Sequence, residues 1–162
     1  MSEDSATPAR GQQVFSAVAV IHKQVDGINH ILVARRADTK KFLPGKVELP
    51  GGHIDFGEHM TDGLKRELKE ELGVEVNLGA PFAVFDYLNE VKGSHSIEVA
   101  YFAQLKTSEE DISLDPADHS EWFWVTQGTL RKVTDVNGTE DEELEILKEA
   151  FRLLSGHKVR VS

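Results

Sequence analysis

The sequence contains no cysteine, and this absence excludes disulfide bonds, thiolate metal sites and a cysteine nucleophile. No apolar stretch approaches about 18 residues, so the sequence predicts no membrane-spanning helix. The first thirteen residues, MSEDSATPARGQQ, are polar and lack the apolar run of a signal peptide. Together these absences favour a protein of the reducing cytoplasm.

Basic residues are scarce as well. The chain has 18 Lys and Arg against 28 Asp and Glu, which gives a formal net charge of −10. Binding of duplex nucleic acid needs a basic stripe and is therefore disfavoured. A polyphosphate substrate stays compatible with this charge, because bound cations can invert the sign of a site. The length of 162 residues, at 40% hydrophobic, predicts one domain with a sizeable core.

Apolar runs and turn residues predict a mixed sheet between helices. Residues 1–12 are expected to be a flexible tail, and residues 13–162 a single domain. A leucine repeat predicts a helix at 60–72 that ends at Gly73, and an acidic start with Thr139 as cap predicts another that runs to about Leu154. Turns or loops are expected at residues 27–29 and at the two Leu-Pro-Gly units within 42–52. Strands are expected at 14–22, 31–35, 46–49, 82–88, 96–105 and 121–125.

The most informative stretch is 52–74, GHIDFGEHMTDGLKRELKEELGV. Glu67, Glu70 and Glu71 stand at positions i, i+3 and i+4, which share one face of a helix. Three like charges this close repel one another, and a divalent cation with oxygen ligands is their natural counter-ion. An acidic helix by itself is as often a solvated face.

The full pattern, G-x5-E-x7-R-E-U-x-E-E-x-G-U with U a bulky aliphatic residue, resembles the signature of the Nudix hydrolases at every defining position. The resemblance implies the Nudix α/β/α sandwich. It also implies an enzyme that hydrolyses phosphoric anhydride bonds with Mg²⁺ or Mn²⁺.

The resemblance assigns roles to matching positions of this chain. Glu67, Glu70 and Glu71, with the carbonyl of Gly51, correspond to the metal ligands. Arg66 resembles the residue that holds a glutamate of the motif in register. Glu67 is our first choice for the general base, so Glu67, Arg66 and Glu70 form the predicted catalytic group.

Other residues are weaker candidates. Arg35 and Arg36 precede the loop that leads to the motif, and one of them is expected to meet a substrate phosphate. His53 is a candidate for substrate binding, and Glu58 for loop support or a water-mediated metal contact; an ordinary loop histidine and a helix N-terminal carboxylate are the alternatives. Two further regions could supply the base, Glu98 and the segment 115–121, although each is expected to hold solvated carboxylates. A base-stacking surface could come from aromatic residues that are otherwise expected in the core, namely Phe85, Tyr87, Phe102, Trp122 and Trp124.

The substrate class follows only by elimination. The isomerase branch of the Nudix family needs a cysteine, and the marks of the ADP-ribose, coenzyme A and NADH branches are missing or displaced here. The remaining type hydrolyses a nucleoside triphosphate to the monophosphate and pyrophosphate. Another diphosphate compound, such as a nucleotide sugar or ADP-ribose, and a non-catalytic ligand-sensing module are the alternatives. A homodimer is left open.

Overall fold

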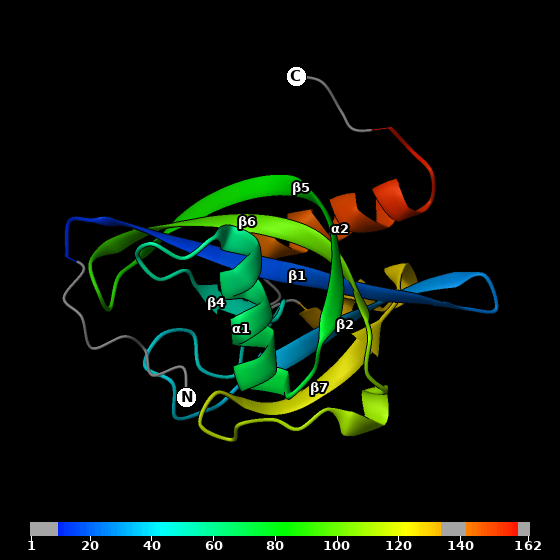
Figure 1. The fold of residues 1–162 in the computed structure, drawn as a ribbon, viewed down its shortest axis with the longest axis horizontal. Helices are drawn as coiled ribbons and strands as arrows, with labels where there is room; N and C mark the ends of the chain where they lie inside the picture. Colours follow the sequence, from blue (N-terminus) through cyan, green and yellow to red (C-terminus); the bar gives the residue numbers. More distant parts are fainter. Residues whose placement is uncertain (1–9, 134–141, 159–162) are drawn as a thin grey trace.

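The computed structural model describes residues 10–133 and 142–158. In these residues a seven-stranded sheet lies between helix α1 (Met60–Leu72) and helix α2 (Glu142–Leu154), which cover opposite faces (Figure 1). Two 3-10 helices, η1 (Glu109–Asp111) and η2 (Gln127–Val133), complete the described elements. The predicted α/β/α architecture is confirmed. No helix of the described part is long and apolar enough to cross a membrane.

Strand β1 (Gln13–Val25) connects the two halves of the sheet. It pairs in parallel with β6 (Ser94–Leu105) and antiparallel with β4 (Gly51–His53) near its start, and antiparallel with β2 (Ile28–Arg36) near its end. The strand order is β3-β2-β1-β6-β5, with β4 on β1 and β7 on β2. The remaining strands are β3 (Val47–Glu48), β5 (Val76–Asn89) and β7 (His119–Val125).

The side chains of β1 alternate between two cores. Ala17, Ala19 and Ile21 face the cluster that contains the leucine stripe of α1, whereas Val18 and Val20 face the cluster that contains Leu147 and Phe151 of α2. This alternation is the period-2 pattern of a strand buried on both faces. Each fully buried leucine or phenylalanine contributes about 1.5–3 kcal/mol relative to exposure.

Helix α1 has the predicted bounds and ends at Gly73, whose φ of 68° is the left-handed conformation that glycine adopts without steric cost. His59 makes no side-chain cap hydrogen bond at the other end. Gly63 lies inside the helix and packs against the preceding loop. A Cβ there would stand 2.6 Å from Glu58 Oε1 and from Ile54 Cδ1.

Three expectations about strands and turns were wrong. The turn lies at residues 26–27, and Ile28 and Asn29 already pair with β1. The second Leu-Pro-Gly unit leads directly into β4, so Gly51 belongs to a strand rather than a loop. Strand β5 begins six residues before the expected 82, because register shifts around Pro81 let the strand pass a residue that cannot donate to the ladder. The proposed cap Thr139 lies outside the described residues.

Candidate active site

The acidic face of α1 lies against β4, the short strand that precedes it. Glu67 and Glu71 are each only 5% exposed, whereas Glu70 is exposed. Gly51 and Gly52 pair with β1 and present no side chain at this edge of the sheet. The two buried carboxylates can therefore reach the backbone of β4.

Glu67 fills the space that a side chain at residue 52 would occupy. A Cβ on Gly52 would stand 2.5 Å from Glu67 Cδ. One carboxylate oxygen, Oε1, accepts a hydrogen bond of 2.9 Å from Arg66 Nη1, while the other, Oε2, is buried without a partner among the described residues. Burial raises the pKa of Glu67. Burying a carboxylate oxygen without a hydrogen-bond donor costs free energy. Binding a proton or a cation at Glu67 Oε2 would remove that cost.

Arg66 organises the carboxylates around it. Its guanidinium donates to both oxygens of Glu58, at 2.8 and 2.9 Å, and to the carbonyl oxygen of His53 at 3.0 Å. It also reaches Glu70 at 3.4 Å. The hydrogen bond from Arg66 lowers the pKa of Glu58 to about 2, so Glu58 is ionised at neutral pH. Arg66 thus ties the loop before α1 to the acidic face of the helix.

The donor set around Gly51 fits a hard divalent cation. Glu71 Oε2 accepts a hydrogen bond of 3.1 Å from the Gly51 backbone N–H, and burial with neighbouring negative charge raises the pKa of Glu71 well above its usual value. In residues 10–133 and 142–158 no three acidic or histidine side chains already converge as a ligand cluster. Carboxylates and a backbone carbonyl are nevertheless the ligands that Mg²⁺ and Mn²⁺ prefer. The unpartnered Oε2 of Glu67 is an available ligand atom.

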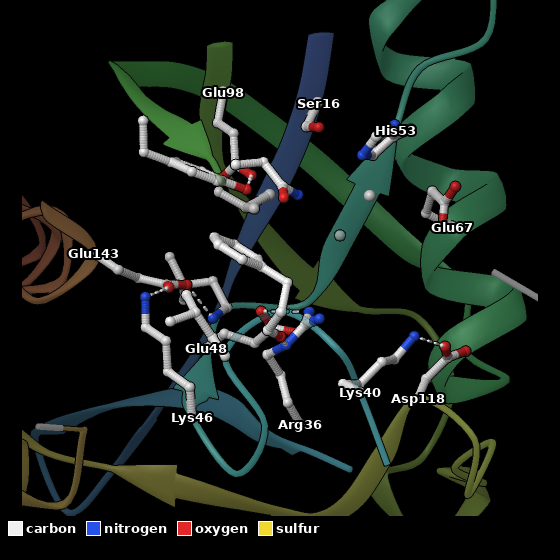
Figure 2. Close-up of a pocket in the computed structure, with 18 of the residues that line it drawn as sticks. Ser16, Arg36, Lys40, Lys46, Glu48, His53, Glu67, Glu98, Asp118 and Glu143 are labelled. Atoms are coloured by element: carbon white, nitrogen blue, oxygen red, sulfur yellow. Dashed lines mark hydrogen bonds and ion pairs between the residues drawn. The ribbon is translucent and has the colours of Figure 1, made fainter. Parts of the chain in front are cut away.

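A cavity of about 1010 Å³ opens beside these carboxylates (Figure 2). Glu67 reaches it from α1 on one side, and Glu143 from α2 on the other. Two lysines that line the cavity form ion pairs with acidic side chains. Lys40 pairs with the buried Asp118 at 2.8 Å, and Lys46 with Glu143 at 3.3 Å. The cavity is large enough for a nucleotide and carries both signs of charge.

Three further carboxylates line the cavity away from α1. Burial raises the pKa of Glu143 to about 8 and that of Glu98 to about 7. Glu48 differs, since its hydrogen bond with His119 and the positive charges of Arg36 and Lys46 outweigh burial and lower its pKa. Glu143 also accepts a short hydrogen bond from the Leu49 N–H, which ties α2 to the segment between β3 and β4.

Of the four weaker site candidates, two line the cavity and two do not. Arg36 and His53 line the cavity, and Arg36 donates to the Phe42 carbonyl at 3.0 Å. Arg35 turns away to Glu121, its cross-strand partner on β7, at 2.8 Å, because consecutive side chains of a strand point to opposite faces. Glu58 does not line the cavity, and its carboxylate instead accepts hydrogen bonds from Arg66, so its predicted role in loop support stays a prediction.

Of the candidate aromatic residues, two line the cavity. Phe85 and Tyr87 do so from β5, and Tyr87 lies parallel to Phe42, with ring centroids 5.9 Å apart. The others lie elsewhere: Phe102 stacks on Phe82, and Trp122 contacts Trp124 edge to face.

The expectation that Glu98 and the 115–121 segment hold only solvated carboxylates was wrong. Glu98 is half-buried and lines the cavity, and Asp118 is 3% exposed and also lines it. Both were named as candidate bases, and their location beside the cavity leaves that prediction open.

Sequence reasoning missed the side of the cavity formed by Phe42, Lys46, Glu48 and Glu143. Glu143 follows Val74, the last residue of the motif, by 69 residues, and its acidic neighbours suggest a solvated helix start. A weak signal was present in Glu48, since a charged residue between apolar ones in a short strand often faces a site. Tertiary packing of α2 is what brings these residues together.

The sequence matches a known protein family and several of its members. The NUDIX domain family matches residues 14–145. The Nudix hydrolase YfcD of Escherichia coli K12 is 43% identical over 65 residues, which cover 40% of this chain and 33% of that protein. The m7GpppN-mRNA hydrolase NUDT17 of Danio rerio is 26% identical over 160 residues, covering 90% of this chain and 52% of that protein. The chain thus spans about a third to a half of the length of these relatives.

Solved structures share the fold at low sequence identity. A MutT protein of Methanosarcina mazei Go1 superposes with a TM-score of 0.67 at 22% identity, covering 94% of this chain and all of that one (100%). An Ap4A hydrolase of C. elegans superposes with a TM-score of 0.71 at 21% identity, covering 89% of this chain and 99% of that one. With the motif on α1, the glycine pair of β4 and a family match over most of its length, this chain belongs to the Nudix hydrolase family.

Proposed function

We propose that the protein is a divalent-metal-dependent pyrophosphohydrolase that converts a nucleoside triphosphate to the monophosphate and pyrophosphate. The observation that carries this proposal is the placement of Glu67. Its carboxylate is buried against Gly52, is held through one oxygen by Arg66, and has its second oxygen unpartnered beside the cavity. Family membership and the complete motif support hydrolysis of a phosphoric anhydride bond, and the triphosphate substrate is part of the proposal.

The proposed roles follow from these contacts. Glu67, Glu70, Glu71 and the Gly51 carbonyl would hold Mg²⁺ or Mn²⁺, which neutralises the diphosphate and orients the attacking water when bound. Glu67 would accept the proton of the attacking water, since its carboxylate lies beside the cavity and is held by Arg66. Arg66 positions Glu67 and does not itself need to touch the substrate.

The substrate phosphates have candidate partners on the cavity wall. Arg36 and Lys40 line it, and Arg36 is half-buried with its guanidinium on the Phe42 carbonyl. A guanidinium binds phosphate oxygens bidentately and an ammonium binds them as a point charge. His53 lies next to the glycine pair and is the nearest candidate in sequence to the metal ligands.

A larger diphosphate compound is the second candidate, and the cavity volume favours it. About 1010 Å³ is at the upper end of the range for small-ligand pockets. Similar structures include an Ap4A hydrolase and a NUDIX domain of Shewanella oneidensis NrtR bound to ADP ribose. Nucleotide sugars, ADP-ribose and dinucleoside polyphosphates therefore belong in the same test.

The test is a phosphate-release assay over a substrate panel with Mg²⁺. Added pyrophosphatase reveals triphosphate cleavage, and added alkaline phosphatase reveals cleavage of capped diphosphates. We expect turnover of nucleoside triphosphates and none in EDTA. Turnover of capped compounds alone would favour the second candidate, and binding without any turnover would favour a ligand-sensing module.

Two variants make the assay specific to the proposed site. Glu70→Gln keeps the shape of the side chain and removes a ligand charge, so we expect a loss of about 10²-fold or more in kcat. Glu75→Gln removes the same charge from an exposed residue just after the helix and should leave the rate unchanged. Full activity of Glu70→Gln, or full activity in EDTA, would contradict the proposal.

A further inference from the structure

A row of four side chains crosses the cavity floor on neighbouring strands. His53 of β4 pairs in register with Ser16 of β1, Ser16 with Glu98 of β6, and Glu98 with Phe85 of β5. All four line the cavity, and Figure 2 shows Ser16 between His53 and Glu98. Because adjacent strands are about 4.8 Å apart, Glu98 stands roughly 10 Å from the β4 edge. That span suits a nucleotide whose phosphates lie at α1 and whose base lies near Glu98.

Glu98 is oriented by an aromatic neighbour. The Tyr87 hydroxyl donates a hydrogen bond of 2.8 Å to Glu98 Oε1. The Tyr87 ring in turn lies nearly parallel to Phe42, with an interplanar angle of 10°. A fixed carboxyl group beside a pair of aromatic rings is a combination that recognises planar heterocycles, which stack on the rings and present hydrogen-bonding edges.

Charged and titratable groups from several elements act on Glu98. Tyr87 approaches from β5, Glu48 from β3, Glu143 from α2, Lys46 from the residue before β3, and Arg36 from β2. Burial raises the pKa of Glu98 to about 7, the negative charge of Glu48 adds to this, and the Tyr87 hydrogen bond and the two cations oppose it. Both protonation states are therefore accessible near neutral pH.

We propose that Glu98 is a specificity-determining residue that reads the edge of the substrate's nucleobase while the base stacks on the Phe42 and Tyr87 rings. The inference rests on the proposed function in requiring a nucleotide substrate. An ionised carboxylate has two acceptors and matches guanine, which offers two adjacent donors. A protonated carboxyl group has one donor and one acceptor and matches adenine. The preferred base thus changes with the protonation of Glu98.

The test measures binding, so that it is independent of turnover. Calorimetry with the α,β-methylene analogues of ATP and GTP is run from about pH 6 to about pH 8.5 on the wild-type protein. We expect the affinity ratio of the GTP analogue to the ATP analogue to rise about tenfold over this range. Glu98→Gln, whose amide has one donor and one acceptor at every pH, should give a ratio that favours adenine and does not vary with pH.

A second variant tests the same inference without changing Glu98 itself. Tyr87→Phe keeps the ring and removes the donor that lowers the pKa of Glu98, so the midpoint of the pH-dependent ratio should move to higher pH. Glu75→Gln is the matched loss of charge outside the cavity and should reproduce the wild-type curve. Thermal melts of all variants identify any loss of folded protein.

The outcomes separate this inference from the proposed function. It is overturned if the wild-type protein binds neither analogue, binds both with a ratio that is constant with pH, or keeps its pH-dependent ratio after Glu98→Gln. It is also overturned if Glu98→Gln lowers kcat equally for all bases without changing the binding ratio, since that result would identify Glu98 as the general base. A wild-type protein that discriminates bases through Glu98 but releases no phosphate from any triphosphate would support the inference and contradict the proposed function.

Discussion

Arg66 and Glu67 are neighbours in the sequence, and their side chains are hydrogen-bonded at 2.9 Å. Consecutive residues of a helix point about 100° apart, so this contact requires Arg66 to fold back over the helix surface. The same guanidinium is anchored to both oxygens of Glu58. One carboxylate oxygen of Glu67 is thereby fixed, and the other stays available beside the cavity.

Arg66→Lys is expected to lower kcat by about 10-fold to 10²-fold with little change in KM. An ammonium cannot donate in a planar fork to Glu58, Glu67 and the His53 carbonyl at once. Glu67 would therefore lose its fixed orientation while the charge is conserved. Steady-state kinetics with Mg²⁺ measure this effect. Wild-type kcat in Arg66→Lys would show that charge alone suffices.

Glu70→Gln is expected to leave the melting temperature in EDTA unchanged or higher. Glu70 makes only a 3.4 Å pair with Arg66 at a largely exposed position, and such a pair contributes about 0.5 kcal/mol or less. Its removal also relieves repulsion with Glu67, whose pKa Glu70 helps to raise. Thermal melts in EDTA compare the variant with wild type. A clear drop would make Glu70 a structural residue.

The two glycines of β4 should respond differently to alanine. At Gly52 the new Cβ meets the Glu67 carboxylate, so activity should fall about 10²-fold while the protein stays folded. At Gly51 the new Cβ meets the backbone of Ala17 and Val18, and φ is 153°. Gly51→Ala should therefore destabilise the fold by several kcal/mol, because the β1–β4 pairing must open. Circular dichroism melts and kcat separate the two effects, and equal melting temperatures would contradict this assignment.

The rate with Mg²⁺ should rise with pH and reach its optimum on the alkaline side of neutrality. Glu67 must be ionised to accept a proton from the attacking water, so acid removes the active form of the base. Acid also protonates the ligand carboxylates and weakens metal binding. A pH profile of kcat/KM at saturating Mg²⁺ tests this. An optimum near about pH 5 would contradict the general-base mechanism.

The melting temperature in EDTA should fall as pH rises from about 5 to about 8. Burial raises the pKa of Glu143 from its unfolded value to about 8, so the folded state binds a proton more tightly than the unfolded chain. That contribution to stability is complete below the unfolded pKa and is lost as pH rises through the folded one. Glu143→Gln is uncharged throughout and should show a smaller fall. Parallel curves for both proteins would show that Glu143 does not titrate in this range.

Much of the fold could be predicted from local patterns. The leucine repeat sets the buried face of α1 and Gly73 sets its C-terminal end, since a 3.6-residue period and a left-handed cap depend on nearby residues alone. The strands around Val18 and Ala100 were recognised from β-branched and apolar runs. Strand β4 was missed, because three residues containing two glycines have no strand propensity and pair only when β1 is in place.

Part of the candidate site could also be predicted from the sequence, and part of it depends on packing. The sequence by itself determined the acidic face of α1, because Glu67, Glu70 and Glu71 lie within one turn of a single helix. Only the tertiary structure decided that Arg36 rather than Arg35 lines the cavity, since the alternation of a strand puts the two side chains on opposite faces and only packing decides which face borders the cavity. It also decided that Glu98 and Glu143 share the cavity with α1. Their contacts span distant elements, and the packing of whole layers, rather than any local pattern, determines which side chains meet.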